Sequence, residues 1–376
     1  MSGAAGVALL LAACTSPATV APPNGVSTGT LSARPTPAPS GTPAPVLLPV
    51  KPTGDPMVVA SGLDVPWSIL RLPAGGTLIS LRDDTSIVEL LADGSHRLVT
   101  DVSDAVPSGE GGLLGLAFLA DTDADGGLGW VYAYFTSTSD NRIERMPLGG
   151  KQGTYALGAS ESVLTGIPKA GNHDGGRIAF GPDGLLYATA GDAGNTDNAQ
   201  DMASLGGKIL RMTPTGAVPT DNPFGTLVYS YGHRNPQGIA WDSTGQLWAS
   251  EFGQNAWDEL NQIVPGSNYG WPVVEGVSDD PRFVSPVHEW PTSEASPSGI
   301  AIVGDTIFMA SLRGERLWRV VPSTGEVDEW FVNSFGRLRD VVSGPDATLW
   351  FVSNNTDGRG EPMSGDDRLY QVEVAP

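Results

Sequence analysis

Several residue types are scarce in this sequence, and each scarcity excludes a class of structure or function. Cys14 is the single cysteine, so neither an internal disulfide nor a zinc site built from several thiolates can form. Lys and Arg number 21 against 42 Asp and Glu, which gives a net charge of −21. This balance argues against binding nucleic acid or an anionic membrane surface through charge, because both require clustered cations. The acidic excess by itself indicates solubility.

Long amphipathic helices are also missing, since no stretch shows a sustained 3.6-residue apolar period. Glycine and proline are instead abundant, at 49 and 31 of 376 residues, and 40% of the chain is hydrophobic. Such a composition favours many turns and short strands around a sizeable core. The length suits one large domain or two ordinary ones.

The N-terminus has the pattern of an exported lipoprotein. An apolar run ends in Leu11-Ala12-Ala13-Cys14, which resembles the lipobox of bacterial lipoproteins, where the cysteine is lipidated. The run is too short to span a bilayer as a helix. No basic residue precedes Cys14, which a start codon further upstream would explain. We expect residues 1–14 to be a signal peptide and a lipid to hold the protein on the outer face of a bacterial membrane; the alternative is a free thiol in a disordered tail.

Residues 15–56 are rich in Pro, Ala, Thr, Ser and Gly. A segment of this composition cannot bury enough apolar surface to fold, so we expect a disordered linker that acts as a tether. The folded domain is expected to comprise residues 57–376.

Six segments of this domain share one plan: a short apolar strand, a tight turn and a second apolar strand. They begin at Trp67, Leu116, Ile178, Ile239, Ile300 and Val341. Turn sequences such as Pro-Asp-Gly and Ser-Thr-Gly tolerate the backbone of a hairpin reversal. Two successive intervals are 61 residues and the last is 41. Periods of about 40–50 residues with four strands each are typical of propeller blades, and longer intervals leave room for inserted loops. We predict an all-β fold, a six-bladed β-propeller of four-stranded antiparallel blades; a two-sheet sandwich would not require the hairpin to recur.

Polar residues gather in four loops that adjoin these hairpins. The first is Gly171-Asn172-His173-Asp174-Gly175-Gly176-Arg177. A histidine can transfer protons near neutral pH, and flanking glycines let the backbone approach a ligand closely. Taken alone, however, a loop histidine is more often structural than catalytic.

The other three loops are residues 231–238, 250–259 and 336–340. Carboxylates and loop carbonyls in the second of these suit Ca²⁺, which takes about 6–8 oxygen ligands. In the third, strand alternation places Arg337 and Arg339 on one face, where arginine forks can bind carboxylates. Each loop alone could be a solvated segment or a salt bridge. Because loops at one end of a propeller converge on its axis, we expect the four to form one site.

Five motifs occur in order: GEGGLLGLAF, NHDGGRIAFGPDGLLYATAGD, YGHRNPQGIAW, SEFGQNAWDELNQIVPGSNYGWP and GRLRDV. Together they resemble the soluble PQQ-dependent glucose/aldose sugar dehydrogenases, also called glucose/sorbosone dehydrogenases, over residues 57–376. The resemblance is specific because five long motifs recur in sequence. It implies a six-bladed propeller that binds pyrroloquinoline quinone (PQQ) and Ca²⁺ on its axis.

The resemblance also implies roles for matching residues. His173 matches the general base. Arg234 and Asn235 match residues that contact the quinone, with Arg234 near the reacting carbonyl. Arg337 and Arg339 match residues that hold the cofactor carboxylates.

Metal ligands are implied in the same way. Gly253 and Gln254 match backbone carbonyls on the Ca²⁺ that touches the cofactor. Glu259 and Tyr269 match ligands of a second, structural Ca²⁺, and we include Asp258 of the same loop among the metal residues.

Three positions depart from the family pattern. Glu110 stands where a cofactor-contacting Gln is common, and Arg313 stands where a Lys is common. Asn172 stands where glucose-specific members have Asp beside the base. By analogy alone, Trp290 is expected to pack on the sugar.

The implied reaction oxidises an aldose at C1 to its lactone. His173 would take the hydroxyl proton and the quinone would take the hydride, while Ca²⁺ and Arg234 stabilise the developing oxygen charge. The electron acceptor is unknown. A Ca²⁺-dependent, lactonase-like hydrolase and a non-catalytic binding propeller are the alternatives. Arg337 and Arg339 favour the dehydrogenase, since a hydrolase needs no arginine pair for a tricarboxylate.

Overall fold

The computed structural model describes residues 47–121 and 127–376. The expected signal peptide, Cys14 and most of the expected linker lie outside the described residues. Among the residues described, no helix combines the length and hydropathy that a bilayer span requires.

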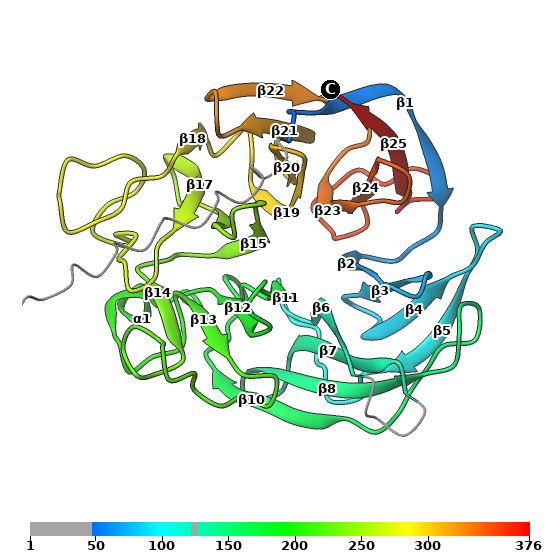
Figure 1. Cartoon of the computed structure of the whole chain (residues 1–376), viewed down its shortest axis with the longest axis horizontal. Helices are drawn as coiled ribbons and strands as arrows, with labels where there is room; N and C mark the ends of the chain where they lie inside the picture. The colour runs from blue at the N-terminus through cyan, green and yellow to red at the C-terminus, as the bar shows by residue number, and fades with distance from the viewer. Residues whose placement is uncertain (1–46, 122–126) are drawn as a thin grey trace, which may run out of the picture. The chain divides into compact units, whose positions relative to one another are not determined.

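Each predicted hairpin forms the first two strands of a separate antiparallel sheet, and the first strands of neighbouring sheets contact one another around a ring (Figure 1). The first three sheets, from the ring's centre outward, are β2 (Pro66–Arg71), β3 (Thr77–Leu81), β4 (Ser86–Leu90) and β5 (His96–Asp101); β6 (Leu113–Ala120), β7 (Gly129–Thr136), β8 (Asn141–Gly149) and β10 (Glu161–Ile167); and β11 (Ile178–Phe180), β12 (Leu186–Ala190), β13 (Lys208–Met212) and β14 (Val228–Tyr231).

The fourth, fifth and sixth sheets are β15 (Pro236–Trp241), β16 (Leu247–Glu251), β17 (Trp257–Ile263) and β18 (His288–Pro291); β19 (Pro297–Val303), β20 (Thr306–Ser311), β21 (Arg316–Val321) and β22 (Glu326–Trp330); and β23 (Leu338–Ser343), β24 (Thr348–Ser353), β25 (Leu369–Ala375) and β1 (Lys51–Ala60). A short strand, β9 (Ala156–Leu157), also pairs with β8, and α1 (Asp197–Gln200) is a single helical turn. The predicted six-bladed β-propeller is confirmed.

The ring is closed by hydrogen bonds between the two ends of the domain. Strand β1 pairs antiparallel with β25, with Lys51 opposite Ala375 and Val58 opposite Tyr370. Strand β1 begins at Lys51, so the expected boundary at residue 57 falls inside it and the expected linker assignment is wrong for residues 51–56. The prolines in this segment suggested a linker, but β1 is the edge strand of its sheet, where a residue without an N–H is tolerated.

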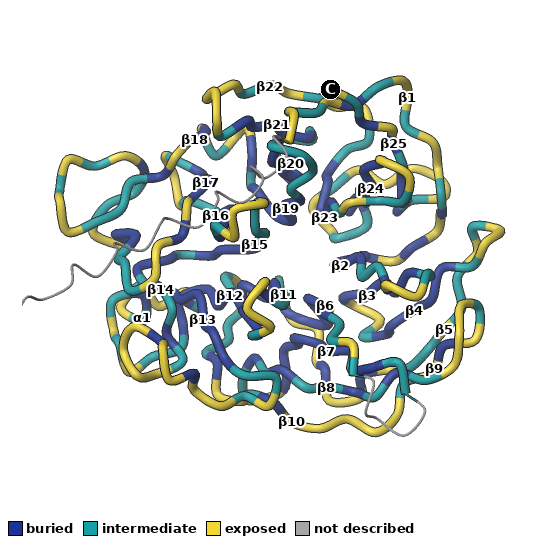
Figure 2. The backbone as a smooth tube through the Cα atoms, in the orientation of Figure 1, coloured by how far each residue is buried: buried dark blue, intermediate teal, exposed yellow. Residues whose placement is uncertain are grey.

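The core lies between neighbouring sheets rather than in one central layer. Every residue of the second strands β3, β12, β16, β20 and β24 is buried, whereas the third strand β8 mixes buried and half-buried positions. Figure 2 shows the buried backbone along the strands and the exposed backbone on the connecting loops. Because a single blade cannot bury both its faces, the repeat is required for stability.

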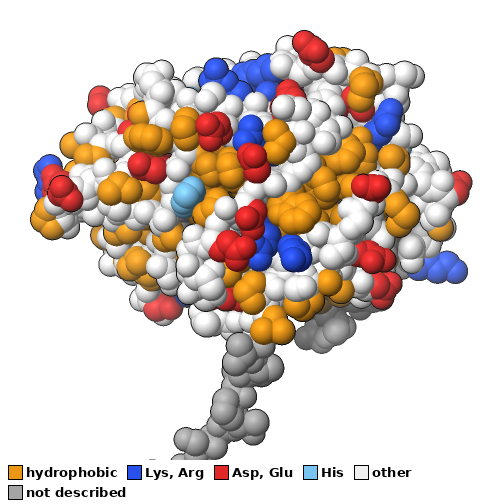
Figure 3. All heavy atoms as spheres, turned by 90° about the horizontal axis from the view of Figure 1, so that it is seen from above, with side chains coloured by type: hydrophobic (Ala, Val, Ile, Leu, Met, Phe, Trp, Pro, Cys, Tyr) orange, Lys and Arg blue, Asp and Glu red, His pale blue; other side chains and the backbone are white. Residues whose placement is uncertain are grey.

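Polar residues fill part of the ring's centre. Arg177 lies over the ring of Trp67, at 4.3 Å from its centroid, and pairs with Asp340 at 3.1 Å. On the face shown in Figure 3, acidic, basic and apolar side chains are interspersed. The ring's centre therefore holds a buried ion pair as well as apolar side chains.

Candidate functional site

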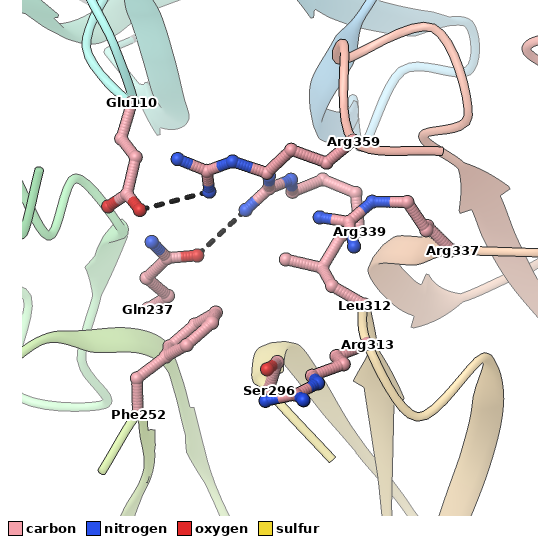
Figure 4. Close-up of a pocket in the computed structure, with 9 residues that line it drawn as sticks. All are labelled: Glu110, Gln237, Phe252, Ser296, Leu312, Arg313, Arg337, Arg339 and Arg359. Atoms are coloured by element: carbon pink, nitrogen blue, oxygen red, sulfur yellow. Dashed lines mark hydrogen bonds and ion pairs between the residues drawn. The ribbon is translucent and has the colours of Figure 1, made fainter. Parts of the chain in front are cut away.

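A cavity of about 330 Å³ lies among loops from four of the six sheets. Its lining residues are Glu110, Gln237, Phe252, Ser296, Leu312, Arg313, Arg337, Arg339 and Arg359 (Figure 4). Most of them stand near the start of a sheet's first strand or beyond the end of its second strand. In an antiparallel hairpin these two positions meet at one edge, which explains why residues distant in sequence surround one space.

Four of the nine lining residues are arginines, and Glu110 is the one carboxylate among them. Arg337 is buried and donates to Asp357, with 2.9 Å between Nη2 and Oδ2. Arg313 makes no hydrogen bond or ion pair with any residue in the described ranges. The lining therefore carries more positive than negative charge.

Arg339 is buried among neutral acceptors. It donates to Oδ1 of Asn354 at 3.1 Å and to Oε1 of Gln237 at 2.8 Å, and reaches Asp357 only at 4.0 Å. Burial lowers the pKa of Arg339, because its charge is removed from water without a close anion. An anion in the cavity would stabilise the charged guanidinium.

His173 is held on its Nδ1 side by a carboxylate. Its Nδ1 lies 2.7 Å from Oδ1 of Asp192, which also accepts the backbone N–H of Gly194 at 2.8 Å; Oδ2 accepts Nε1–H of Trp271 at 2.8 Å. Burial alone raises the pKa of Asp192, but the bonds from His173 and Trp271 outweigh burial and leave it below its ordinary value. Because an ionised carboxylate can only accept, Nδ1 carries the proton and Nε2 is left as the acceptor.

The His173 backbone is in the left-handed region, with φ at 60°. A non-glycine residue pays about 1–3 kcal/mol for such a conformation, so the surroundings must hold it. The backbone N–H of His173 donates to Oε2 of Glu110 at 2.9 Å, and its carbonyl accepts the N–H of Ala193 at 3.1 Å. Asn172, beside it, is exposed.

Arg234 lies beside this group. Its Nη1 donates to the carbonyls of Gly253 at 2.6 Å and Phe252 at 3.3 Å, and its guanidinium lies 5.5 Å from the ring centroid of Trp271. Its Nε is buried and has no partner among the described residues. Asn235 is buried and accepts the N–H of Gly175 at 3.0 Å, which ties together two of the polar loops.

Two buried glutamates lie on a second, very small cavity of about 10 Å³. Oε2 of Glu251 lies 2.8 Å from Nδ1 of His233. Glu259 accepts Nδ2–H of Asn261 at 2.9 Å and the N–H of Gly276 at 2.7 Å. Burial, with the charge of Glu251, raises the pKa of Glu259 to about 8. A cation here would reverse that shift.

The donor set there fits a cation that prefers oxygen. Oδ1 of Asn261 is buried without a partner among the described residues, so an unsatisfied amide oxygen lies on the side chain that bonds Glu259. Within the described ranges no group of three or more His, Cys, Asp or Glu residues surrounds a common point. Amide and backbone oxygens would therefore have to complete the shell, as they do for Ca²⁺.

Three expected metal residues are engaged in other contacts, which leave Tyr269 and Gln254 their backbone carbonyls as donors for a cation. Tyr269 lines the small cavity, but its hydroxyl donates to the carbonyl of Gln262 at 2.7 Å, so only its own carbonyl is left for a cation. Gln254 is exposed and its N–H donates to Glu275. Both oxygens of Asp258 accept backbone N–H groups, from Gly253 at 2.8 Å and Ser296 at 2.5 Å. Asp258 therefore supports the loop, and its contacts do not support a role as a metal ligand.

Trp290 is not brought to the cavity. It lies on β18, the outermost strand of the fourth sheet, with 2% of its surface exposed. Its ring packs 5.5 Å from that of Trp318 in the apolar cluster of the fourth and fifth sheets. The expectation that Trp290 packs on the sugar is therefore corrected: it is a core residue.

Several residues of the site were missed by sequence reasoning. Asp192 lies two residues after β12 and His173 lies five residues before β11 of the same hairpin, so the hairpin itself was a signal. Glu275 was also missed. Its Oε1 accepts the four consecutive N–H groups of residues 254–257, at 2.7 to 3.1 Å. It fixes the loop that carries Gly253. Trp271 and Arg359 were also not singled out.

Comparison with known proteins agrees with this arrangement. Residues 63–363 match the family model described as Glucose / Sorbosone dehydrogenase. The PQQ-bound structure of aldose sugar dehydrogenase from Streptomyces coelicolor is 50% identical, with a TM-score of 0.81, and the match covers 87% of this chain and 98% of that one. The aldose sugar dehydrogenase YliI of Escherichia coli is 29% identical over 80% of this chain and 90% of its own length. Quinoprotein glucose dehydrogenase B of Acinetobacter calcoaceticus is 32% identical over 61% of this chain and 54% of its own length.

Proposed function

The chain belongs to the glucose/sorbosone dehydrogenase family, and from this premise we propose that it oxidises an aldose sugar at C1 to the lactone, with PQQ and Ca²⁺ as cofactors. The observation that carries the proposal is the cavity itself. A surplus of arginines lines it, and a histidine held by a buried aspartate stands at its edge, bonded to the lining residue Glu110.

The residues of the cavity fit a tricarboxylate. Its volume of about 330 Å³ is within the range of ligand sites, roughly 300–1,000 Å³. Arg337, Arg339 and Arg313 would hold the carboxylates through charge-assisted hydrogen bonds. Arg339 and Arg313 have no close anionic partner among the described residues, so both gain from the ligand's charge. When bound, PQQ would supply an electrophilic quinone carbon that can accept a hydride.

His173 would accept the proton of the sugar's C1 hydroxyl on Nε2. Asp192 fixes the tautomer that leaves Nε2 free, and its negative charge stabilises the imidazolium that forms. Trp271 and Gly194 hold Asp192 in turn, so the base has its orientation before the sugar arrives. Arg234 would stabilise negative charge developing on oxygen, and its buried, unpartnered Nε is a donor ready for an acceptor.

Two calcium sites follow from the donor sets. The carbonyl of Gly253, presented by the loop that Glu275 fixes, would serve a Ca²⁺ beside the cofactor together with that of Gln254. Glu259, with Glu251, the amide oxygen of Asn261 and the carbonyl of Tyr269, would serve a second ion with a structural role. Burial and the charge of Glu251 raise the pKa of Glu259, so a bound cation would stabilise its ionised form.

A hydrolase fits the same cavity less well. A lactonase-like mechanism needs several axial carboxylates around a metal-bound water, whereas Glu110 is the one carboxylate of the lining, and both its oxygens are engaged. A binding propeller without catalysis would have no need for the His173–Asp192 pair.

The test is spectroscopic. The purified protein is loaded with Ca²⁺ and PQQ, single aldoses are added, and the absorption of reduced quinone is followed. A reduced-quinone band with at least one aldose is expected. If PQQ binds and no aldose produces the band, the dehydrogenase proposal fails.

Export and anchoring are proposed from the sequence alone. The mature protein from membranes should begin at a lipidated Cys14, and Cys14→Ser should release it from the membrane fraction. Mass spectrometry of the N-terminal peptide tests this, and an unmodified cysteine would contradict it. The proposed partners are the sugar and an electron acceptor of unknown kind. A nucleic-acid partner is not proposed.

A further inference from the structure

One carboxylate joins two loops across the cavity. Oε2 of Glu110 accepts the backbone N–H of His173 at 2.9 Å, and Oε1 accepts Nη1–H of Arg359 at 3.1 Å. Glu110 lies just before β6 in the second sheet, whereas Arg359 lies in the loop between β24 and β25 of the sixth. Figure 4 shows the two side chains meeting across the space.

The pair stands at the solvent side of the cavity, which we call the mouth. The side chain of Arg359 is 57% exposed and that of Glu110 is 21% exposed, whereas Arg337 and Arg339 are buried. A ligand held by the two buried arginines would therefore have the pair between itself and solvent.

The pair also belongs to a continuous chain of polar contacts. Oδ2 of Asp357 accepts Nη2–H of Arg337 at 2.9 Å, and its Oδ1 accepts the backbone N–H of Arg359 at 2.9 Å. Arg359 then reaches Glu110, which reaches the backbone of His173. A cofactor-binding arginine and the expected base are thus linked through Glu110.

We propose that the Glu110–Arg359 ion pair is a clasp across the mouth, which retains the anionic cofactor and holds the His173 loop. The proposal rests on the proposed function for the identity of the ligand. In the clasp, Arg359 is a further cation facing the ligand, and Glu110 is a positioning residue. A half-exposed ion pair is weak, so the clasp can open to admit the cofactor.

The chemistry requires a carboxylate at residue 110. Each of the two contacts uses a different oxygen of Glu110 as the acceptor, and both partners are donors. A glutamine has one acceptor oxygen, and its NH₂ group would face a donor. Glu110→Gln must therefore lose either the contact to Arg359 or the contact to the left-handed His173 backbone.

The first experiment measures retention of PQQ. Wild type, E110Q, R359Q and R359K are loaded with PQQ and Ca²⁺ and diluted, and the released PQQ is followed by its absorbance after rapid filtration. E110Q and R359Q should release PQQ roughly three- to tenfold faster, the size expected for a half-exposed ion pair with its hydrogen bonds. R359K should lie between them and wild type. R282Q, which removes an exposed arginine paired with Asp280, is the matched control. Wild-type release by both E110Q and R359Q would overturn the clasp.

The second experiment needs no cofactor. Hydrogen exchange is measured by mass spectrometry in the cofactor-free protein, on peptides covering residues 171–175 and 357–366. E110Q should raise exchange in at least one of the two peptides, whereas R359Q should raise it in residues 357–366 and leave the His173 N–H protected. Unchanged exchange in both variants would overturn the clasp even where PQQ binds. If the wild type binds no PQQ, the proposed function fails, and the exchange result still decides the clasp.

Discussion

The cavity and the loops beside it that carry His173 differ in how their polar groups are paired. On the side of the fifth and sixth sheets, Arg313 has no partner among the described residues, and Arg339 bonds neutral oxygens. In the neighbouring loops of the third and fourth sheets, Asp192 bonds His173 at 2.7 Å and Trp271 at 2.8 Å. The arginines of the cavity keep their positive charge available for a ligand, whereas the contacts of Asp192 fix the orientation of His173.

This difference teaches that cofactor binding and proton transfer are assigned to different loops at the centre of the ring. An arginine without an anion is stabilised by whatever anion arrives, so that side should control affinity. A histidine whose tautomer is set by a buried aspartate should control the rate once the ligands are bound. Substitutions on the two sides should therefore change different kinetic constants.

The largest effect is expected from His173→Asn. Asparagine tolerates the left-handed backbone at this position, so the loop should keep its path while the base is lost. Turnover of an aldose should fall by about 10²- to 10⁴-fold, the usual contribution of a general base, with little change in the affinity for PQQ. Steady-state kinetics and a PQQ titration check this. Turnover near the wild-type rate would remove His173 as the base.

Arg339→Gln should show the opposite pattern. Loss of a charge-assisted contact, worth about 1.5–3 kcal/mol, should weaken PQQ binding by about 10- to 100-fold. At saturating PQQ, turnover should stay within a few-fold of wild type, because the His173 side is untouched. Equilibrium titration and kinetics on the same preparation separate the two constants. A fall in turnover without a change in PQQ affinity would contradict the assignment of affinity to the arginines and of rate to His173.

The fold was more predictable from the sequence than the site. The hairpins could be found because each carries its own signal, an apolar strand, a turn and a second strand. Five of the six second strands proved buried at every residue, and β7 at every residue but Trp130. Strand β1 gave no such signal. Its partner β25 is at the other end of the chain, and its prolines are tolerated only because it is an edge strand.

Candidate residues were found where they occur in long motifs, but the contacts between them were not, even where both residues lie in such motifs. Asp192 and Trp271 are 79 residues apart, and Glu110 and Arg359 are 249 apart, so only the closed ring brings each pair together. Trp290 shows the converse error, because it was predicted to contact the sugar and is buried in the core. The sequence around an aromatic residue in an outer strand does not indicate whether it faces the core or a ligand. Loop-to-loop contacts depend on the ring's curvature, which no local pattern encodes.

Removal of calcium should lower the thermal stability of the protein. Adding Ca²⁺ at about 100 times its Kd should raise Tm by several degrees, because mass action then contributes about 2.7 kcal/mol. Glu259→Gln should lose most of this gain, whereas Glu161→Gln, an exposed glutamate paired with Arg145, should keep it. Differential scanning calorimetry with EDTA and with Ca²⁺ gives both values. An equal gain in Glu259→Gln would contradict the second calcium site.

The smallest effect is expected at Asp174, next to His173, where the fixed geometry is incomplete. Its Oδ1 accepts Nδ2–H of Asn141 at 3.0 Å, but its buried Oδ2 has no partner among the described residues, and burial raises its pKa to about 6. In the unfolded chain the pKa of an aspartate is about 3.9. The raised pKa therefore stabilises the protein below about pH 4, and this contribution is lost as the pH rises to 6, because the unfolded state releases its proton first.

Asp174→Asn removes that loss. Its Tm should match wild type near pH 4 and exceed it by a few degrees at pH 7, for a gain on the order of 1–2 kcal/mol. Asp258 is the matched control, because burial also raises its pKa to about 6 but both its oxygens accept backbone N–H groups. Asp258→Asn would turn an NH₂ group toward a donor and should lower Tm at either pH. If Asp174→Asn lowered Tm at pH 7, Oδ2 would have a partner that is essential to the His173 loop, and the geometry on that side would be as complete at Asp174 as at Asp192.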